Sequence, residues 1–259
     1  MPSLNKRTIA IMQPTYMPWV GLFDLYDQVD VMVWYDDVQI VKRSWDCRNR
    51  IKTLKGEQLL TVPVFKNKNR DNTKFNNASI NYEQNWSRKH LQALRLNYKK
   101  SLNFEVMDSW LTPILQEKYE TIADLNISII ERFANYLNIE TPSVRSSELN
   151  NISGSKDERL ANICKRLEAT DYLSPLGSGA YMEEETPGGK VAKEGVTVKY
   201  QNYVHPIYEQ QHGEFISHLS ILDLMYNYKF GECLDIIRSG RKESIPCEKY
   251  HLHMEKLNK

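Results

Sequence analysis

The sequence lacks both a long hydrophobic run and an excess of charge of either sign. Its 259 residues include 34 Lys and Arg against 33 Asp and Glu, which leaves a net charge of +1. This balance supplies no overall attraction to nucleic acid or to an anionic membrane, so we expect neither as a partner. Because no stretch reaches the roughly 18–20 apolar residues of a transmembrane helix, we also expect no membrane span.

Cysteine motifs and signal features are equally scarce. The four cysteines are scattered without any C-x-x-C pair, so neither a disulfide framework nor a zinc site is indicated. There is no G-x-S-x-G sequence and no cysteine in an obvious nucleophile context, which argues against covalent acyl-enzyme chemistry. The first residues, MPSLNKRTIAIMQ, lack the apolar segment of a secretory signal, so we expect a cytoplasmic location.

Aromatic residues, by contrast, are plentiful. Fifteen tyrosines and five tryptophans are more than packing alone usually requires, and several lie beside polar residues in loop-like segments. This content favours a site that stacks on, or forms hydrogen bonds with, a polar organic ligand.

The N-terminal part of the chain predicts a βαβ unit. Thr8–Gln13 and Asp30–Tyr35 are short apolar runs that indicate buried strands, and Trp19–Val29 between them has apolar residues at helical spacing. A strand, a helix and a strand within about 30 residues form a parallel pair. We therefore predict an α/β fold, Rossmann-like, with a largely parallel central sheet flanked by helices.

The rest of the chain continues the alternation of helices and strands. Residues 49–65 predict a hairpin insertion that ends near Pro63, and Ser155 with Glu158 forms a capping-box pattern. The elements predict a single α/β domain over 1–240, followed by a polar, frayed tail over 241–259. Further helices are expected over 83–100, 110–137, 155–167 and 215–237, and further strands over 141–149, 171–174 and 196–200.

Three segments are expected to meet at one edge of this sheet. In open parallel sheets, ligands bind beyond the carboxyl ends of the strands. Residues 13–19, 36–50 and 174–181 each follow a predicted strand and would lie there. Their convergence predicts a single binding site.

Substrate-binding residues are expected in the first and third segments. In Q-P-T-Y-M-P-W-V-G, two prolines fix the backbone, and we expect Gln13, Tyr16 and Trp19 to line a pocket. The alternative is that Trp19 only packs the helix onto the sheet. In P-L-G-S-G-A-Y, which contains Ser178 and Tyr181, two glycines allow backbone N–H groups to approach an anion. An ordinary tight turn is the alternative there.

The second segment concentrates positive charge. Lys42, Arg43, Arg48, Arg50 and Lys52 lie within eleven residues. Guanidinium groups bind phosphate oxygens bidentately. We expect Lys42, Arg43, Arg48 and Arg50 to bind a substrate phosphate, and a solvated cationic loop is the alternative.

Two acids close the second predicted strand. Asp36 and Asp37 are candidate ligands of Mg²⁺ beside substrate phosphates, because this cation prefers one or two carboxylates together with phosphate oxygens. Hydrogen bonds to ribose hydroxyls, or ion pairs with Arg43 and Arg48, are the alternatives. Asp37 is also a candidate catalytic residue.

Histidines are the candidate bases. His205 and His212 lie in a loop-like segment rich in Tyr and Gln, and an imidazole with a pKa near ~6.5 can accept the proton that an attacking amine loses. We expect one of these two in the site. His90 lies within a predicted helix beside apolar neighbours, where a packed histidine is at least as well supported as a catalytic one.

Several of these segments together resemble the WbqC-like family. The resemblance rests on QPTYMPWVGLFDLYDQVDVMVWYDDVQIVKRSWDCRNRIK, LLTVPV, NWSRKHLQALRLNYKK, DYLSPLGSGAY and FISHLSILDLMYN, and it extends from about Thr8 to Asn227. The Q-P-x-Y-x-P-W-x-G element is its distinctive part. Because that family occurs among genes for bacterial O-antigen and other surface polysaccharides, the resemblance implies modification of a nucleotide-linked amino sugar.

The same opening is also similar to that of HIGH-motif nucleotidyltransferases and pantothenate-synthetase-type ligases. In those proteins two loop histidines bind the triphosphate of ATP. The equivalent stretch here, Tyr16 to Trp19, contains no histidine.

Three functions are consistent with these features. The first is ATP-dependent formation of an amide (carbon–nitrogen) bond between a small carboxylic or amino acid and the amine of a nucleotide-linked amino sugar, with ATP and Mg²⁺ as cofactors. The second is a glycosyl- or acyltransferase that uses a ready-made donor. The third is a non-catalytic binding protein of the same pathway. A homodimer is one assembly consistent with the sequence.

Overall fold

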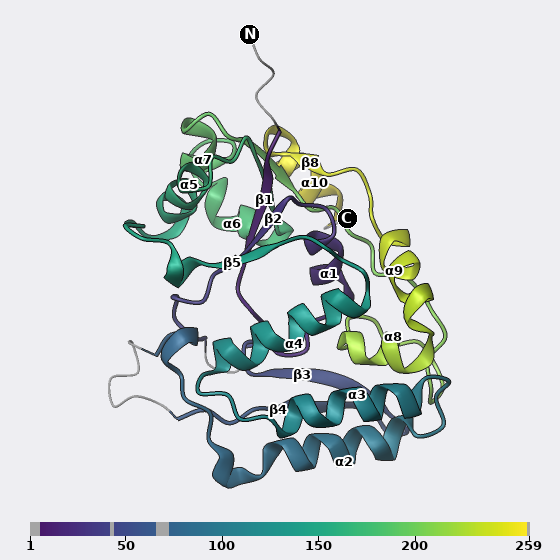
Figure 1. Ribbon diagram of the computed structural model, residues 1–259. Helices are drawn as coiled ribbons and strands as arrows, with labels where there is room; N and C mark the ends of the chain where they lie inside the picture. Colours follow the sequence, from purple (N-terminus) through teal and green to yellow (C-terminus); the bar gives the residue numbers. More distant parts are fainter. Residues whose placement is uncertain (1–5, 42–43, 66–72, 258–259) are drawn as a thin grey trace.

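The centre of the molecule is a mostly parallel sheet. The structure, a computed structural model, describes residues 6–41, 44–65 and 73–257. Within these residues six strands form the central sheet in the order β5-β2-β1-β6-β7-β8, and every pairing is parallel except that of β7 with β8 (Figure 1). The strands are β1 (Thr8–Met12), β2 (Val31–Trp34), β5 (Ser143–Arg145), β6 (Asp171–Ser174), β7 (Thr197–Tyr200) and β8 (Ile245–Pro246).

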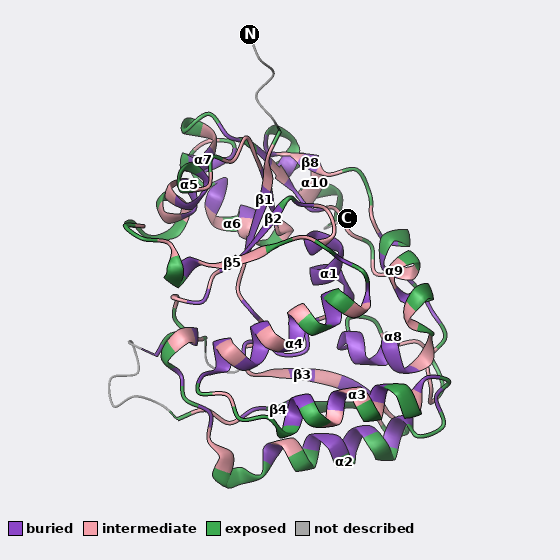
Figure 2. Cartoon of the chain, viewed as in Figure 1, coloured by how far each residue is buried: buried purple, intermediate pink, exposed green. Residues whose placement is uncertain are grey.

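Helices cover both faces of this sheet because the strand side chains alternate. Ile9 and Ile11 of β1 pack into one hydrophobic cluster, whereas Ala10 between them packs into the other. Figure 2 shows β1 and β2 buried between the helices. Helices on the first face are α5 (Lys156–Arg166), α6 (Gly179–Met182), α7 (Gly189–Lys193) and α10 (Tyr250–Leu257). Helices in the second cluster include α1 (Val20–Tyr26), α4 (Ile122–Tyr136) and α9 (Phe230–Ser239).

The predicted βαβ unit is confirmed. β1 and β2 are parallel neighbours, with Ile9 opposite Val31 and Met12 opposite Trp34, and α1 connects them. The strand order runs from β1 to β2 and β5 on one side and to β6 and β7 on the other. This reversal between β1 and β6 is the type of position where open α/β sheets bind ligands. The fold is therefore the predicted α/β, Rossmann-like one.

The second cluster extends beyond the carboxyl ends of the strands into a smaller layer. The predicted hairpin is confirmed as β3 (Arg48–Thr53) and β4 (Gly56–Thr61), an antiparallel pair. Figure 1 shows this hairpin between α4 and two further helices. The additional helices of this layer are α2 (Trp86–Tyr98), α3 (Phe104–Gln116) and α8 (Ile221–Asn227).

Three local predictions differ from the structure. The helix expected over 215–237 is divided into α8 and α9, because the last carbonyl groups of α8 accept hydrogen bonds from Asn103 instead of from a continuing helix. In the segment expected as a frayed tail, β8 pairs with β7, and Tyr250 of α10 packs into the core. Ser155 precedes α5, as predicted, but its side chain makes no capping hydrogen bond.

The loop from Gln13 to Trp19 joins the two layers. The Asn126 side chain of α4 donates hydrogen bonds to the carbonyl oxygens of Pro14 at 2.7 Å and Asp46 at 2.8 Å. The Asn49 side chain of β3 donates to the carbonyl oxygens of Tyr16 and Met17. Buried carbonyl groups need such donors. The unusual sequence after β1 is therefore explained first by its place between the sheet and the hairpin layer.

Gly21 is required by the packing of Trp19. A Cβ at Gly21 would lie 2.3 Å from Cη2 of the Trp19 indole. Helix propensity alone predicts that Gly21→Ala stabilises α1 by about 1 kcal/mol. The overlap predicts the reverse, a loss of about 1–3 kcal/mol in the free energy of unfolding. Denaturant titration measures the difference, with Gly177→Ala as control, because a Cβ there meets no atom within 4 Å. Equal stability of the two variants would contradict this interpretation.

Candidate functional site

Trp19 lies at the centre of a group of rings beyond the carboxyl ends of β1 and β7. Its indole stacks on His205 with ring centroids 6.1 Å apart and on His218 with centroids 5.0 Å apart, and Tyr203 meets it edge-on at 5.5 Å. Tyr203 and His205 follow β7, and His218 precedes α8. We call these four residues the tryptophan–histidine cluster. It brings the loop after β1 together with the segment around His205.

The two histidines of this cluster are chemically distinct. His218 is exposed, and its φ of +58° lies in the left-handed region that a side chain disfavours. His205 is half-buried, and its Nδ1 donates to the carbonyl oxygen of Pro206 at 2.9 Å. That bond leaves Nε2 as the acceptor, and this buried atom has no hydrogen-bond partner among the described residues.

Both imidazoles are held in the neutral form. Burial lowers the pKa of His205, the hydrogen bond to Pro206 acts in the opposite direction, and protonation of His218 would lower this pKa further. Burial, and then the charge of Arg50, lower the pKa of His218. Because both shifts are downward from 6.5, each ring is unprotonated at neutral pH and is able to accept a proton.

Arg50 links the cluster to an exposed tryptophan. Its Nη2 donates to the His218 carbonyl oxygen at 3.2 Å, and its Nη1 lies 2.8 Å from both carboxylate oxygens of Glu57. The guanidinium groups of Arg50 and Arg48 lie 5.2 and 5.9 Å from the Trp45 ring centroid. The Trp45 side chain is 45% exposed. A phosphate that binds Arg50 must therefore compete with Glu57 or bind beside it.

The loop between the two histidines is fastened to β3. Lys52 is 1% exposed, and its Nζ donates to Oε1 of Gln210 at 3.0 Å and to the carbonyl oxygen of Glu214. The buried carboxyl group of Asp223 accepts a hydrogen bond from the Tyr98 hydroxyl at 2.8 Å. Burial raises the pKa of Asp223 to about 6, although Lys52 acts in the opposite direction. These contacts hold the loop over the hairpin.

Tyr16 lies in the core instead of lining a pocket. Its side chain is 0% exposed, and its hydroxyl donates to Nδ1 of His90 at 2.9 Å. Burial lowers the pKa of His90 to about 4, so this ring is neutral, and its hydrogen bond to the Thr61 backbone leaves Nδ1 as the acceptor. Of the two alternatives for His90, the structure shows the packed one. Gln13 is half-buried at the end of β1.

Asp36 and Asp37 are occupied by donors from the protein. Asp36 is 0% exposed and accepts hydrogen bonds from the Ser147 amide at 3.0 Å, the Ser147 hydroxyl at 2.8 Å and the Ser146 hydroxyl at 3.2 Å. Asp37 accepts a bond from the Ser146 hydroxyl and pairs with Arg159. Mg²⁺ needs free carboxylate oxygens and room for water, so this pair does not fit a magnesium site. Asp37 forms an ion pair, as one of the alternatives expected, but its partner is Arg159 of α5.

The glycine-rich loop after β6 packs against the C-terminal helix. A Cβ at Gly179 would lie 2.2 Å from Cε2 of Tyr250, so close packing explains this glycine. Ser178 and Tyr181 are half-buried beside it, and burial raises the pKa of Tyr181. These contacts support the tight-turn interpretation of the segment.

The remaining predicted site residues lie elsewhere. His212 donates through Nε2 to the carbonyl oxygen of Asn97 at 2.7 Å and lines a cavity at the tip of the hairpin. Lys42 and Arg43 lie outside the described residues. Within the described part of the chain, no group of three or more His, Cys, Asp or Glu side chains is arranged to hold a metal ion. No helix of that part is long and apolar enough to cross a membrane.

Two members of the site were not predicted. His218 follows Ser217 in FISHLS, where no local pattern distinguishes it, and its partner Arg50 is far away in the sequence. Trp45 lies inside the predicted cationic segment, and a tryptophan between Lys and Arg residues is a signal for an exposed stacking surface.

Comparison with known proteins identifies the family. The family model described as "WbqC-like protein family" matches residues 13–233. The chain is 36% identical over 237 residues to the uncharacterized protein Rv1507c of Mycobacterium tuberculosis, an alignment that covers 91% of this chain and 100% of that protein. No solved structure matches the chain significantly. The match covers the loop from Gln13 to Trp19, the hairpin and both histidines of the cluster, and the chain belongs to the WbqC-like protein family.

Proposed function

We propose that the tryptophan–histidine cluster is the active site of an enzyme that forms an amide bond on the amino group of a nucleotide-linked amino sugar. The observation that carries this proposal is the exposed imidazole of His218, whose pKa is lowered, which stacks on the Trp19 indole and whose backbone carbonyl oxygen accepts a hydrogen bond from Arg50. A neutral, accessible imidazole beside a cation is suited to remove a proton from a substrate that carries negative charge elsewhere.

The chemical step is an acyl transfer. The amine nitrogen attacks the carbonyl carbon of an activated acyl donor, and a carbon–nitrogen bond forms. The leaving group departs with the electron pair of its bond to that carbon. His218 accepts the proton that the nitrogen loses, and it is the base of the step because its ring is exposed. His205 supports the Trp19 side of the cluster.

The nucleotide portion is assigned to the neighbouring surface. The exposed Trp45 indole offers a stacking face for a nucleobase. Arg48 and Arg50, near the same ring, supply positive charge for a diphosphate. Because Arg50 also contacts the His218 backbone, a phosphate bound there brings the sugar close to the base.

A ready-made acyl donor is the favoured source of the carbonyl group. The sequence pointed first to activation by ATP and Mg²⁺, which requires a place for the metal beside the phosphates. The Asp36 and Asp37 carboxylates, the candidates for that place, are engaged by Ser146, Ser147 and Arg159. We assign the reaction to the cytoplasmic steps of bacterial surface-polysaccharide (O-antigen) biosynthesis.

Mass spectrometry of the products tests this function. The protein is incubated with nucleoside-diphosphate amino sugars and either acyl-coenzyme A thioesters or a free carboxylic acid with ATP and Mg²⁺. We expect the sugar nucleotide to gain the mass of one acyl group in the thioester arm. Product in the ATP arm alone would assign the protein to the carbon–nitrogen ligases instead. Absence of product in both arms, together with no heat of binding for any sugar nucleotide, would overturn the proposed function.

A further inference from the structure

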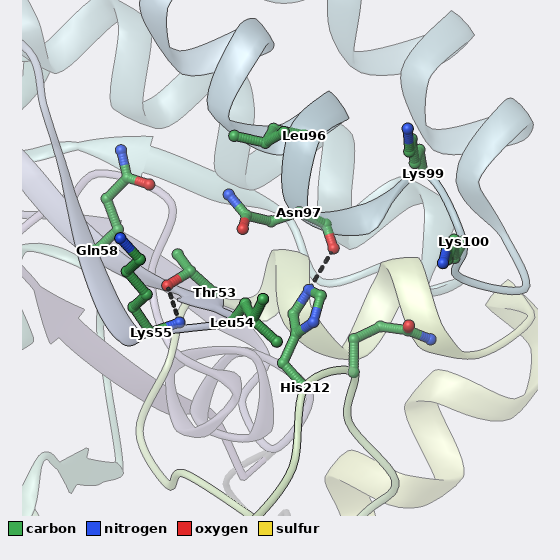
Figure 3. A pocket seen from close by; sticks show the side chains of 10 residues that line it. Thr53, Leu54, Lys55, Gln58, Leu96, Asn97, Lys99, Lys100 and His212 are labelled. Atoms are coloured by element: carbon green, nitrogen blue, oxygen red, sulfur yellow. Dashed lines mark hydrogen bonds between the residues drawn. The ribbon is translucent and has the colours of Figure 1, made fainter.

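A cavity opens at the tip of the hairpin, apart from the tryptophan–histidine cluster. Its volume is about 720 Å³, and it lies between the β3–β4 turn, the C-terminal end of α2 and the loop that carries His212 (Figure 3). Arg50 of β3 contacts the first site, whereas Thr53 and Leu54 at the end of the same strand line this cavity. The lining residues are Thr53, Leu54, Lys55, Gln58, Leu96, Asn97, Lys99, Lys100, Gln211 and His212.

The charged side chains that line this cavity are all lysines. Lys55 comes from the hairpin, and Lys99 and Lys100 come from the end of α2. Figure 3 shows Lys55 on one side of the opening and the other two lysines on the opposite side. The lining contains no Asp or Glu residue. On a chain with a net charge of +1, this arrangement concentrates positive potential at one point.

Helix stabilisation explains only part of this charge. Lysines at the C-terminal end of a helix interact favourably with its partial negative charge, and this accounts for Lys99 at the C-cap of α2 and for Lys100 directly after it. Lys55 lies in the turn of a hairpin and has no such role. One carbonyl group in the last turn of α2, that of Asn97, also already accepts a hydrogen bond from His212.

The same cavity also exposes apolar surface. Leu54 is 80% exposed and Leu96 is 74% exposed, and both line the cavity. A leucine at the tip of a hairpin contributes nothing to the core at that exposure, and it leaves a methyl-rich surface in water. Amide groups of Gln58, Asn97 and Gln211 lie among the leucines and the lysines.

We propose that this cavity binds an amphipathic anion, in which a short apolar chain carries a carboxylate or a phosphate monoester at one end. The leucines contact the chain, and the lysines on the two sides of the opening contact the anionic group. His212, which lines the cavity, is held by its hydrogen bond to Asn97. The ligand therefore lies against the loop that begins at His205 and ends at His218. The assignment does not rest on the function proposed for that cluster.

Isothermal titration calorimetry with octanoate and with octyl phosphate tests this site and distinguishes the two head groups. We expect saturable binding of at least one of them. Acetate, which lacks the chain, should bind at least about tenfold more weakly. Octyltrimethylammonium, which has the opposite charge, should not bind. Failure of both anionic probes to bind, or equal binding of the cationic probe, would overturn the proposal. Binding to anionic phospholipid vesicles but not to monomeric octanoate or octyl phosphate would also overturn it, in favour of a membrane surface.

Two variants locate the binding in this cavity. Replacement of Lys55 and Lys99 by glutamine should weaken binding of the tighter probe about tenfold or more. Lys89→Gln, on the same helix but outside the lining, should leave the affinity unchanged. All three side chains are exposed, so the variants should keep the wild-type circular dichroism spectrum and melting temperature. Wild-type affinity in the Lys55 and Lys99 double variant would place the binding elsewhere and refute the assignment.

Discussion

Replacement of His218 by glutamine should lower kcat/KM for acyl transfer to the amino sugar by about 10²–10⁴-fold, the usual contribution of a general base. Glutamine keeps a polar side chain of similar length but cannot take a proton at neutral pH. The exposed His218 ring is not part of the core, so the melting temperature should change little. His253→Gln on α10, outside the cluster, is the matched control and should keep wild-type kinetics. Equal activity of the two variants would exclude His218 as the base.

The pH profile of the same reaction tests the lowered pKa of His218. A base works when it is unprotonated, so kcat/KM should rise with pH and level off once His218 has lost its proton. Because the pKa of His218 is lowered from 6.5, the midpoint of this rise should lie below pH 6.5. Arg50→Gln removes one cause of the lowered pKa, so the rise should move to higher pH. An unchanged profile in Arg50→Gln, with only a higher KM, would restrict Arg50 to substrate binding.

The elements that could be predicted from sequence are those set by local pattern. β1 and β2 are apolar runs of a parallel sheet, and their parallel pairing follows from the helical connection between them. The hairpin follows from two strand-like runs around Gly56. The division between α8 and α9 could not be predicted in this way, because its cause is a hydrogen bond from Asn103, far away in the chain.

The site was predicted in outline but not in its individual roles. Tyr16 has the composition of a ligand-binding residue, but its partner His90 comes from a helix 74 residues later and places both in the core. Asp37 has the position of a metal ligand, but Arg159 lies 122 residues later and pairs with it. The sequence around Tyr16 and Asp37 gives no indication that His90 and Arg159 are their partners. Trp19 was singled out because it follows a predicted strand, and His205 because it lies in a loop-like segment rich in Tyr and Gln, and the structure stacks the two rings.

Replacement of Asn126 by alanine should lower the free energy of unfolding by about 2–5 kcal/mol, because two buried acceptors lose their donor. Asn126 is 0% exposed, and its amide nitrogen lies 2.7 Å from the Pro14 carbonyl oxygen and 2.8 Å from that of Asp46. These two carbonyl groups belong to the loop after β1 and to the segment that leads into the hairpin. One side chain of α4 therefore holds the sheet and the hairpin layer together at the candidate site.

Two further variants separate the hydrogen bonds from the packing. Asn126→Leu fills a similar volume without a donor, so it should remain destabilised by most of the same amount. Asn162→Ala on α5 removes a bond to the Ser153 carbonyl oxygen at the surface, and it should cost less than about 1 kcal/mol because water replaces the donor. Urea titration measures all three. Stability of Asn126→Leu close to wild type would show that Asn126 fills space in the core, and that the loop from Gln13 to Trp19 is held by its other contacts.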